Sequence, residues 1–473
     1  MKLSEEKNVK HRLESFLLFD YHGVEKHLCK MAQNGWKLEE TGRYFWKYRK
    51  IEPADLKYAI TYVPDASDWN PEPTDSQLTL EEYCAEAGWE KIGDWEQMQI
   101  FCSAEDHPIP IDTDEALRLD VIKKSMKKTF IPAQISVLLC MLIFLVQQFA
   151  LSFQPDPIEY LSQNHTLLLA AFMVYVTVAN LMNLFSYFSW CRRSEAAAAE
   201  GGACAESPNY QLIQKVTLVL TVLFVIAFTV TFMQESGNGA GAFMVLYLSI
   251  FAVVCVTVEQ LRRWLKRSGV SKTTNWVVTI LAAALLAFVL IGVTVFVSLQ
   301  NNWLSEKPAA VYTAADGREY EIYRDEIPLT VQNLQDADHP NYSYRAQGGS
   351  SPLISHYDYR QHVWYTPGEQ KLPSLDYEIT EVNVQALYDF CLAEYLDDTD
   401  SKLIWGETAG YYPADAAPWG ADTVYQYRCE GYAANEWILC KDNRIVRLYA
   451  SWPLDAEQMA IAGQKLLGEQ RIK

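Results

Sequence analysis

Five long apolar stretches in the middle of the chain constrain its fold more than any other feature. They run from Ile131 to Phe153, Thr166 to Trp190, Leu212 to Met233, Ala242 to Val258 and Trp276 to Leu299. A helix rises about 1.5 Å per residue, so most of these stretches can cross a hydrocarbon core of about 30 Å, and the fourth does so narrowly. The sequence therefore predicts an integral membrane protein with five transmembrane helices in a lipid bilayer.

The chain on either side of these stretches is polar enough to form soluble domains. We predict an α+β domain over residues 1–112, here called the head, and a second α+β domain over residues 300–473, here called the tail. A juxtamembrane helix over residues 113–130 is expected to join the head to the transmembrane region, residues 131–299. Because the number of spans is odd, we expect head and tail on opposite sides of the membrane.

Basic residues occur in every second connection, and this pattern predicts the orientation. They are Lys123, Lys124, Lys127 and Lys128, then Arg192, Arg193 and Lys215, then Arg262, Arg263, Lys266, Arg267 and Lys272. Lys and Arg near span ends stay in the cytoplasm. We therefore expect a multi-pass protein of the cell membrane with a cytoplasmic head and an extracytoplasmic tail. The charged start, MKLSEEKNVKHRLES, has no apolar core, so the first span is expected to act as the insertion signal.

The charge and the cysteines argue against several kinds of function. The formal net charge is −19, and the tail has about two acidic residues for each basic one, so no nucleic-acid partner is expected. The cysteines form no Cys-x-x-Cys pair, and the chain has no nucleophile elbow, metalloprotease helix or phosphate-binding loop with Lys. We predict no metal, no cofactor, no catalytic residue and a non-enzymatic role, with an enzymatic tail as the least favoured alternative.

The head contains two segments that align with each other. The first reads ESFLLF, a helix, GWKLEET and YFWKYRK; the second reads LKYAITYV, a helix, GWEKIGDW and MQIFCS. The helices are expected over about Gly23 to Asn34 and Leu80 to Ala87, and Thr79 with Glu82 predicts a capping box for the second. The order predicts two strand-helix-strand-strand units that form one antiparallel sheet with both helices on one face.

Such duplicated units resemble the gyrase-inhibitor-like fold, in which a cleft between two halves takes up small molecules. The resemblance implies a ligand cleft in the head, lined by aromatic side chains. The candidates are Trp36, Tyr44, Trp46, Trp89 and Trp95. The alternative is that these side chains fill a small hydrophobic core.

The head also resembles a known family. The residues that carry the resemblance are MAQNGWKLEET, YFWKYRK, YAITYV and YCAEAGWEKIGDWEQMQIFCS, within Leu13 to Ala104. They are similar to the bacterial family catalogued as domain of unknown function 2812. The resemblance implies a cytoplasmic domain followed by membrane spans, and a transcriptional regulator encoded nearby as a partner. It implies no activity, because none is assigned to the family.

The tail has the pattern of a mixed domain with five or six strands. Asp316 and Gly317 predict a hairpin turn between VYTAA and REYEIY. Apolar residues at helical spacing predict a helix over Asn383 to Tyr395. Asp455 is expected to cap a closing helix.

Two features of the tail are candidate sites. Four aromatic residues that lie among Gly and Pro predict a binding surface, with ordinary packing as the alternative. They are Trp405, Tyr411, Tyr412 and Trp419. If Ala434 and Asn435 form a turn, Cys429 and Cys440 lie opposite each other within reach of a disulfide; the alternative is two buried thiols.

Two functions compete. In the first, the protein is a non-enzymatic membrane sensor or regulator, whose head binds a small molecule or protein and whose tail meets an external partner. In the second, it belongs to a transport or membrane-stress and drug-tolerance system, and Asn180 and Asn183 on one face of the second span contribute to a polar path. Their alternative role is helix packing. No Asp, Glu, Lys, Arg or His lies near the centre of a span, which favours the first function.

Overall fold

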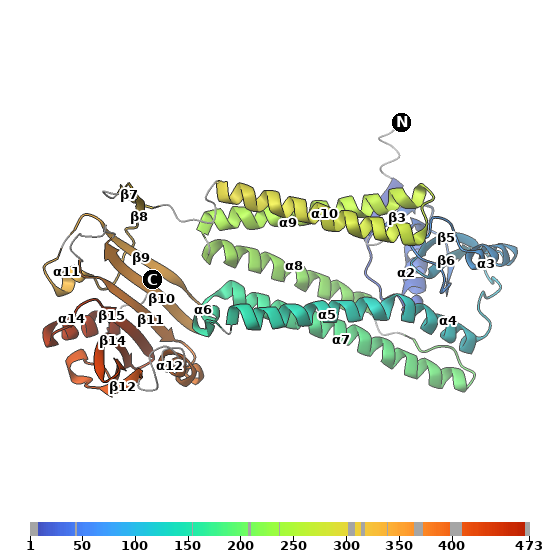
Figure 1. The fold of residues 1–473 in the computed structure, drawn as a ribbon. Helices are drawn as coiled ribbons and strands as arrows, with labels where there is room; N and C mark the ends of the chain where they lie inside the picture. Colours follow the sequence, from blue (N-terminus) through green and yellow to red (C-terminus); the bar gives the residue numbers. More distant parts are fainter. Residues whose placement is uncertain are drawn as a thin grey trace. The chain divides into compact units, whose positions relative to one another are not determined.

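The structure is a computed structural model that divides into two compact units. It describes residues 8–42, 45–153, 155–206, 210–235, 237–300, 308–313, 317–337, 339–363, 372–397 and 409–468. The first unit consists of Met1–Val146, Ala171–Ala227 and Phe243–Ser298, and the second consists of Gln147–Ala170, Phe228–Ala242 and Leu299–Lys473. Figure 1 labels the helices and strands of both units.

Among the described residues, five helices are long and apolar enough to cross a membrane, as predicted. They are Glu115–Phe153, Asn164–Ala199, Tyr210–Glu235, Phe243–Arg267 and Lys272–Gln300. The first combines α4 (Glu115–Lys128), α5 (Phe130–Gln148) and the π-helical turn η2 (Phe149–Phe153). The others lie in α7 (Asn164–Ala199), α8 (Tyr210–Glu235), α9 (Gly237–Arg267) and α10 (Lys272–Gln300), and the short helix α6 (Pro157–Ser162) precedes α7.

Helices α4 and α5 are joined without a loop. Thr129 between them has φ −127° and ψ −61°. Its N–H still donates to the carbonyl of Ser125 at 3.2 Å, and its carbonyl accepts from the N–H of Ala133 at 3.1 Å. Thr129 therefore keeps both of its helical hydrogen bonds, whereas Pro132, which has no N–H, cannot donate to the carbonyl of Lys128.

The head has the predicted order of elements but not the predicted single sheet. The first unit of four elements is β1 (Val9–Leu13), α2 (Tyr21–Gln33), β2 (Trp36–Glu40) and β3 (Phe45–Lys50). The second is β4 (Lys57–Tyr62), α3 (Asp75–Glu86), β5 (Glu90–Trp95) and β6 (Met98–Ser103). Each forms its own three-stranded antiparallel sheet, in the orders β1-β3-β2 and β4-β6-β5.

The two helices contact opposite faces of the second sheet, whereas the prediction placed both on one face. Helix α2 shares a core with Met98, Ile100 and Cys102 of β6. Helix α3 packs through Cys84 against Phe101, which points to the other side of β6. Alternate side chains of a strand point to opposite faces, and every residue of β6 is buried. The strand therefore requires cover on both sides.

Two local predictions in the head were wrong. The segment from Glu14 to Phe19, predicted as a strand, is the connection between β1 and α2. Helix α3 begins at Asp75 rather than Leu80, because the capping box lies five residues earlier than predicted. The Thr74 hydroxyl accepts from the N–H of Gln77, and the Gln77 side chain accepts from the N–H of Thr74.

The head shares its hydrophobic core with the adjacent ends of the membrane helices. That core includes Val24 and Leu28 of α2, Ile122 and Met126 of α4, Phe130 of α5, Tyr187 and Trp190 of α7, and Tyr210 of α8. Removing apolar surface from water is worth roughly 25 cal/mol per Å². The same burial therefore stabilises the head and holds it against these helix ends.

The tail contains a seven-stranded antiparallel sheet rather than one of five or six strands. Its order is β12 (Gly410–Ala414), β13 (Thr423–Cys429), β14 (Tyr432–Lys441), β15 (Arg444–Ala450), β11 (Leu375–Val382), β10 (Ile354–Val363) and β9 (Tyr342–Ser350). Strands β7 (Ala310–Thr313) and β8 (Glu319–Ile322) form the predicted hairpin, and Asp316 of its turn lies outside the described residues.

Helices cover both faces of this sheet (Figure 1). Helix α14 (Ala456–Leu467) is capped by Asp455, as predicted, and packs on β14 and β15. It also contacts η4 (Ala417–Trp419) and α11 (Val331–Leu334), which belong to the same core. Helix α12 (Tyr388–Leu396) continues from the 3₁₀ turn η3 (Gln385–Leu387) and covers the opposite face. This confirms the helix predicted over Asn383 to Tyr395, with later bounds.

Candidate functional site

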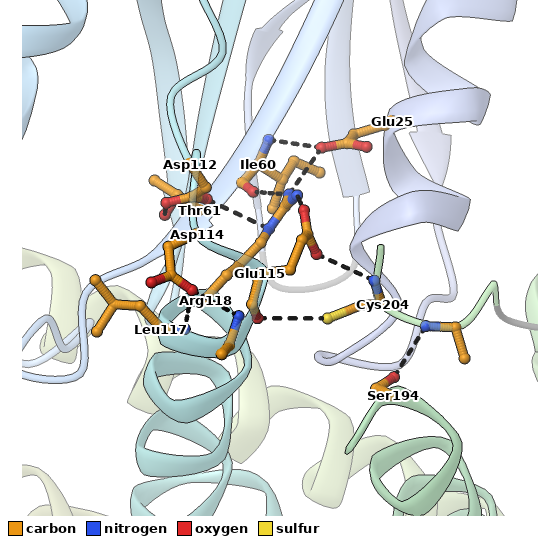
Figure 2. Close-up of polar contacts among 12 residues, drawn as sticks. Glu25, Ile60, Thr61, Asp112, Asp114, Glu115, Leu117, Arg118, Ser194 and Cys204 are labelled. Carbon is orange, nitrogen blue, oxygen red and sulfur yellow. Dashed lines mark hydrogen bonds and ion pairs between the residues drawn. The ribbon is translucent and has the colours of Figure 1, made fainter. Parts of the chain in front are cut away.

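Arg118 of α4 is the centre of a polar cluster where the head meets the first membrane helix (Figure 2). Helix α4 begins at Glu115 because the carboxylate of Asp114 accepts from the N–H groups of Ala116 at 2.9 Å and Leu117 at 3.0 Å. A cap of this kind satisfies backbone donors that have no partner inside the helix. It fixes the first turn, which carries both Glu115 and Arg118.

The Arg118 guanidinium contacts both four-element units of the head. Its Nη2 donates to the carbonyl of Ile60 in β4 at 3.0 Å, and its central carbon lies 4.0 Å from the ring centre of Tyr21 in α2. Glu25 of α2 accepts from the N–H of Ile60 at 2.9 Å and lies 3.6 Å from Nη2 of Arg118. Figure 2 shows these groups converging. Helices α2 and α4 are therefore both bound to strand β4.

Three carboxylates surround this single cation. Besides Glu25, Asp112 lies 3.3 Å from Nε of Arg118 and Glu115 lies 3.5 Å from Nη1. The Arg118 side chain is 15% exposed, so water screens these charges weakly. Burial raises the pKa of Glu25 to about 7, against the opposing effect of Arg118, and burial also raises the pKa of Asp112. The charge of the cluster therefore changes near neutral pH.

Glu115 also holds the segment that follows α7. Its carboxylate accepts from the N–H of Cys204 at 3.1 Å. The hydroxyl of Ser194, near the end of α7, accepts from the N–H of Ala205 at 3.1 Å, and the indole N–H of Trp190 donates to the carbonyl of Ala205 at 2.9 Å. Figure 2 shows the contacts of Ser194 and Cys204. The connection after the second span is therefore bound to the first turn of α4.

Phe19 packs directly between the head and the adjacent ends of the membrane helices. It lies just before α2 and is 0% exposed. Its ring centre lies 5.3 to 5.6 Å from those of four aromatic side chains on three helices. These are Phe130 of α5, Tyr187 and Trp190 of α7, and Tyr210 of α8. Protein interiors are close-packed, so Phe19 cannot shift without displacing at least one of these helices.

The second four-element repeat of the head, β4 to β6, also contacts the fourth span, which lies in α9. Arg262, near the end of α9, donates to the carbonyl of Asp68 at 3.3 Å and lies 3.5 Å from its carboxylate. On α4, Lys128 pairs with Asp65 at 2.6 Å. The connection between β4 and α3 therefore contacts two membrane helices at their basic ends.

The structure distributes the predicted aromatic cleft residues of the head over two cores. Trp46 is 1% exposed and its ring centre lies 6.0 Å from that of Trp95. Trp36 packs against the same core. Trp89 belongs to the separate small core under α3, and Tyr44 lies outside the described residues. A ligand cleft shared by these residues stays a prediction.

The predicted aromatic surface of the tail has a different local structure from the one expected. Tyr411 and Tyr412 lie on the edge strand β12 rather than in a loop. Trp419 lies in η4, is 3% exposed, and packs with its ring centre 5.3 Å from that of Trp437. Trp405 lies outside the described residues. The binding role of this set also stays a prediction.

Sequence analysis missed a polar cavity of about 700 Å³ beside Tyr411, lined by residues of the tail and by residues at the start of α6. Its acidic lining residues are Asp156, Glu159, Asp358, Glu378, Glu394, Asp397 and Glu436, and its basic ones are Arg360 and Arg447. The acidic residues come from separate elements of the fold, so no motif could reveal them. The acidic composition of the tail was the available signal.

The register of β13 and β14 does not bring Cys429 and Cys440 together. The turn lies at Glu430 and Gly431, so the turn predicted at Ala434 and Asn435 was wrong. Cys429 pairs with Tyr432, which leaves Cys440 roughly 27 Å further along β14 at about 3.4 Å per residue. Both are free cysteines, and a disulfide requires Cα atoms within about 7 Å.

Comparison with known proteins identifies a family for the head but no individual relative. No curated protein and no solved structure matches the chain. Residues 20–133 match a family model, from the N-cap of α2 through α4 to the start of α5. The match includes Tyr21, Glu25, Ile60, Asp112 and Arg118 and ends one turn into the first apolar stretch. The N-terminal region of this chain carries a domain of the family described as Protein of unknown function (DUF2812).

Proposed function

We propose that this protein is a non-enzymatic membrane sensor or regulator, whose head responds to a cytoplasmic ligand or partner and passes the response to the membrane helices. The basic connections support a cytoplasmic head and an extracytoplasmic tail. The observation that carries the proposal is the burial of Phe19 among rings of α5, α7 and α8. Through this contact, a displacement of Phe19 in the head changes the packing of three membrane helices.

The Arg118 cluster supports the same proposal. Coupling between two sites needs an element whose arrangement both sites influence. Helix α4 is such an element, because its first turn binds α2 and β4 through Arg118 and its other end continues into α5. Glu115 adds the connection between the second and third spans.

The transport alternative loses support from the placement of its two asparagines. Asn183 accepts from the side chain of Gln214 on α8 at 2.9 Å, and Asn180 donates to the carbonyl of Val176 in its own helix at 2.8 Å. Both amides serve helix structure and packing. We therefore favour the sensor function.

The variant Phe19→Ala tests the proposal in the full-length protein. Cells that lack the gene are supplied with the wild type, with Phe19→Ala or with Phe45→Ala, and their transcripts are compared. Phe45→Ala is the matched control, because Phe45 is 60% exposed on β3. We expect Phe19→Ala to reproduce the transcript profile of the deletion at equal membrane abundance, and Phe45→Ala to restore the wild-type profile. Full restoration by Phe19→Ala would refute the proposal.

A further inference from the structure

A cavity of about 450 Å³ lies beside α2 at the start of α8. Its basic lining residues are Arg12, Lys26 and Lys30, together with the imidazoles of His22 and His27. Tyr210 and Gln211, the first residues of α8, line the side nearest the membrane helices, and Asp20 lines the start of α2. Positive charge therefore exceeds negative charge among the described lining residues.

A buried carboxylate behind the cavity fixes part of this lining. Glu14 is 8% exposed. It lies 3.1 Å from Nε of Arg12 and 2.9 Å from Nε2 of His27, and it accepts from the amide of Gln211 at 3.0 Å. The hydroxyl of Tyr48 donates to it at 3.1 Å. Because these donors satisfy Glu14, it orients Arg12, His27 and Gln211 rather than repelling an anion.

Two side chains on α2 remain available to a ligand. Lys26 pairs with Glu206 at 3.0 Å, but both side chains are more than half exposed, at 65% and 73%. Exposed pairs of this kind are weak, so an anion in the cavity can displace Glu206. Lys30, one turn further along α2, also lines the cavity with an exposed side chain.

We infer that this cavity binds the phosphate of a phosphate-bearing organic anion, with Lys26 and Lys30 as its main ligands and Arg12 beside them. The cavity is larger than a bare phosphate needs and lies in the range of small-molecule sites. Since α8 begins at its rim, the phosphate belongs either to a phospholipid headgroup or to a soluble phosphate ester. The inference rests on the proposed function, because it names the chemical class to which the head responds.

Binding at this cavity has a direct route to the Arg118 cluster. Displacing Glu206 from Lys26 frees one end of the segment whose Cys204 is bound to Glu115. Helix α2 also carries Glu25, one turn away from the cavity residue His22, on the side that contacts Arg118. Occupancy of the cavity is therefore linked to the first turn of α4 through Glu115 on one side and through α2 on the other.

The test uses the full-length protein in nanodiscs and has two arms. In the first, ATP is titrated into nanodiscs of phosphatidylcholine and binding is measured by calorimetry. In the second, the unfolding temperature of the head is compared between nanodiscs with and without phosphatidylglycerol. Each arm is repeated with the double variant Lys26→Gln/Lys30→Gln. The matched control is Lys124→Gln, which removes a 63% exposed charge from α4.

We expect either ATP binding or a higher unfolding temperature with phosphatidylglycerol. The double variant is expected to weaken the affinity for the phosphate-bearing ligand about tenfold, and the control is expected to leave it unchanged. A response to ATP identifies a soluble phosphate ester, and a response to phosphatidylglycerol identifies a lipid headgroup. No response in either arm, or an equal effect of the double variant and the control, overturns the inference. Because the readout is binding, this result is independent of the transcript test on Phe19.

Discussion

Glu25 and Arg118 bind the two backbone groups of the same residue. Glu25 accepts from the N–H of Ile60 at 2.9 Å, and Arg118 donates to its carbonyl at 3.0 Å. A helix of the head and the helix that leads into the first long apolar stretch therefore meet on one residue of β4. Separating them would leave two partly buried backbone groups without these partners, which is unfavourable.

Replacing Arg118 by Met is expected to destabilise the head. The variant leaves Glu25, Asp112 and Glu115 facing one another without their cation, and losing one partner of a partly buried ion pair costs about 2 to 4 kcal/mol. The measurement is the urea midpoint of tryptophan fluorescence for the full-length protein in nanodiscs. Arg263→Met is the control, because the Arg263 side chain is 50% exposed beside Glu259, and we expect a change within about 0.5 kcal/mol. Equal losses would contradict the role of Arg118.

The head is expected to be more stable in mildly acidic solution. Burial raises the pKa of Glu25 to about 7 in the folded protein, from an ordinary value of 4.5. The folded state therefore holds the carboxyl proton of Glu25 more tightly than the unfolded state. Its contribution is present at pH 5 and is lost as the pH rises through 7. We expect the free energy of unfolding to fall by about 2 kcal/mol between pH 5 and pH 8.

Glu25→Gln should remove most of this pH dependence, because the amide oxygen still accepts from Ile60 and carries no charge. The comparison is a series of urea midpoints between pH 5 and pH 8. Glu82→Gln, at an exposed position of α3, should retain the wild-type slope. A slope that survives in Glu25→Gln would assign the effect to another group, such as Asp112.

Two glycines that end the helices of the head should tolerate alanine unequally. Gly35 and Gly88 have φ of 81° and 83°, where an L residue costs about 1 to 2 kcal/mol. A Cβ on Gly35 would also meet the carbonyl oxygen of Ile51 at 3.0 Å, whereas one on Gly88 would meet the flexible end of Glu105. We expect the larger loss of unfolding free energy for Gly35→Ala. A loss at Gly88 that equals or exceeds it would contradict this reasoning.

Reporter fusions should determine the orientation. Alkaline phosphatase is active outside the cytoplasm, and green fluorescent protein is fluorescent inside it. A fusion to the C-terminus should give active phosphatase and no fluorescence, because five spans precede it. A fusion after Arg267, at the end of α9, should give the opposite result. The reverse pattern would place the head outside and remove the cytoplasmic ligand from the proposal.

Sequence patterns predicted the features that depend on local chemistry. The spans follow from the length of their apolar runs, and the helix ends predicted at Asn34 and Ala87 are the observed C-caps of α2 and α3. The segment from Glu14 to Phe19 was misassigned because an apolar run reads alike in a strand and in a buried connection. Its burial depends on helices more than a hundred residues away, such as α7 and α8.

The Arg118 cluster could not be predicted, although one signal was present. Arg118, Ile122 and Met126 are spaced at i, i+4 and i+8, so a charge lies in line with two fully buried apolar residues. A cation on the buried face of a helix implies carboxylate partners. Which carboxylates they are depends on how α2 and β4 approach α4, and local patterns carry no information on that approach.

The joint at Thr129, between α4 and α5, determines how a movement of the head affects the first span. Thr129 keeps both of its helical hydrogen bonds, but Pro132 has no N–H to donate to the carbonyl of Lys128, so α4 and α5 are joined end to end with one bond fewer than a regular helix. The departure of Thr129 from helical geometry makes bending the easier deformation, so a sideways swing of α4 is absorbed at that point. Under the proposed function, movements of the head along the axis of α4 are the ones expected to reach the first span.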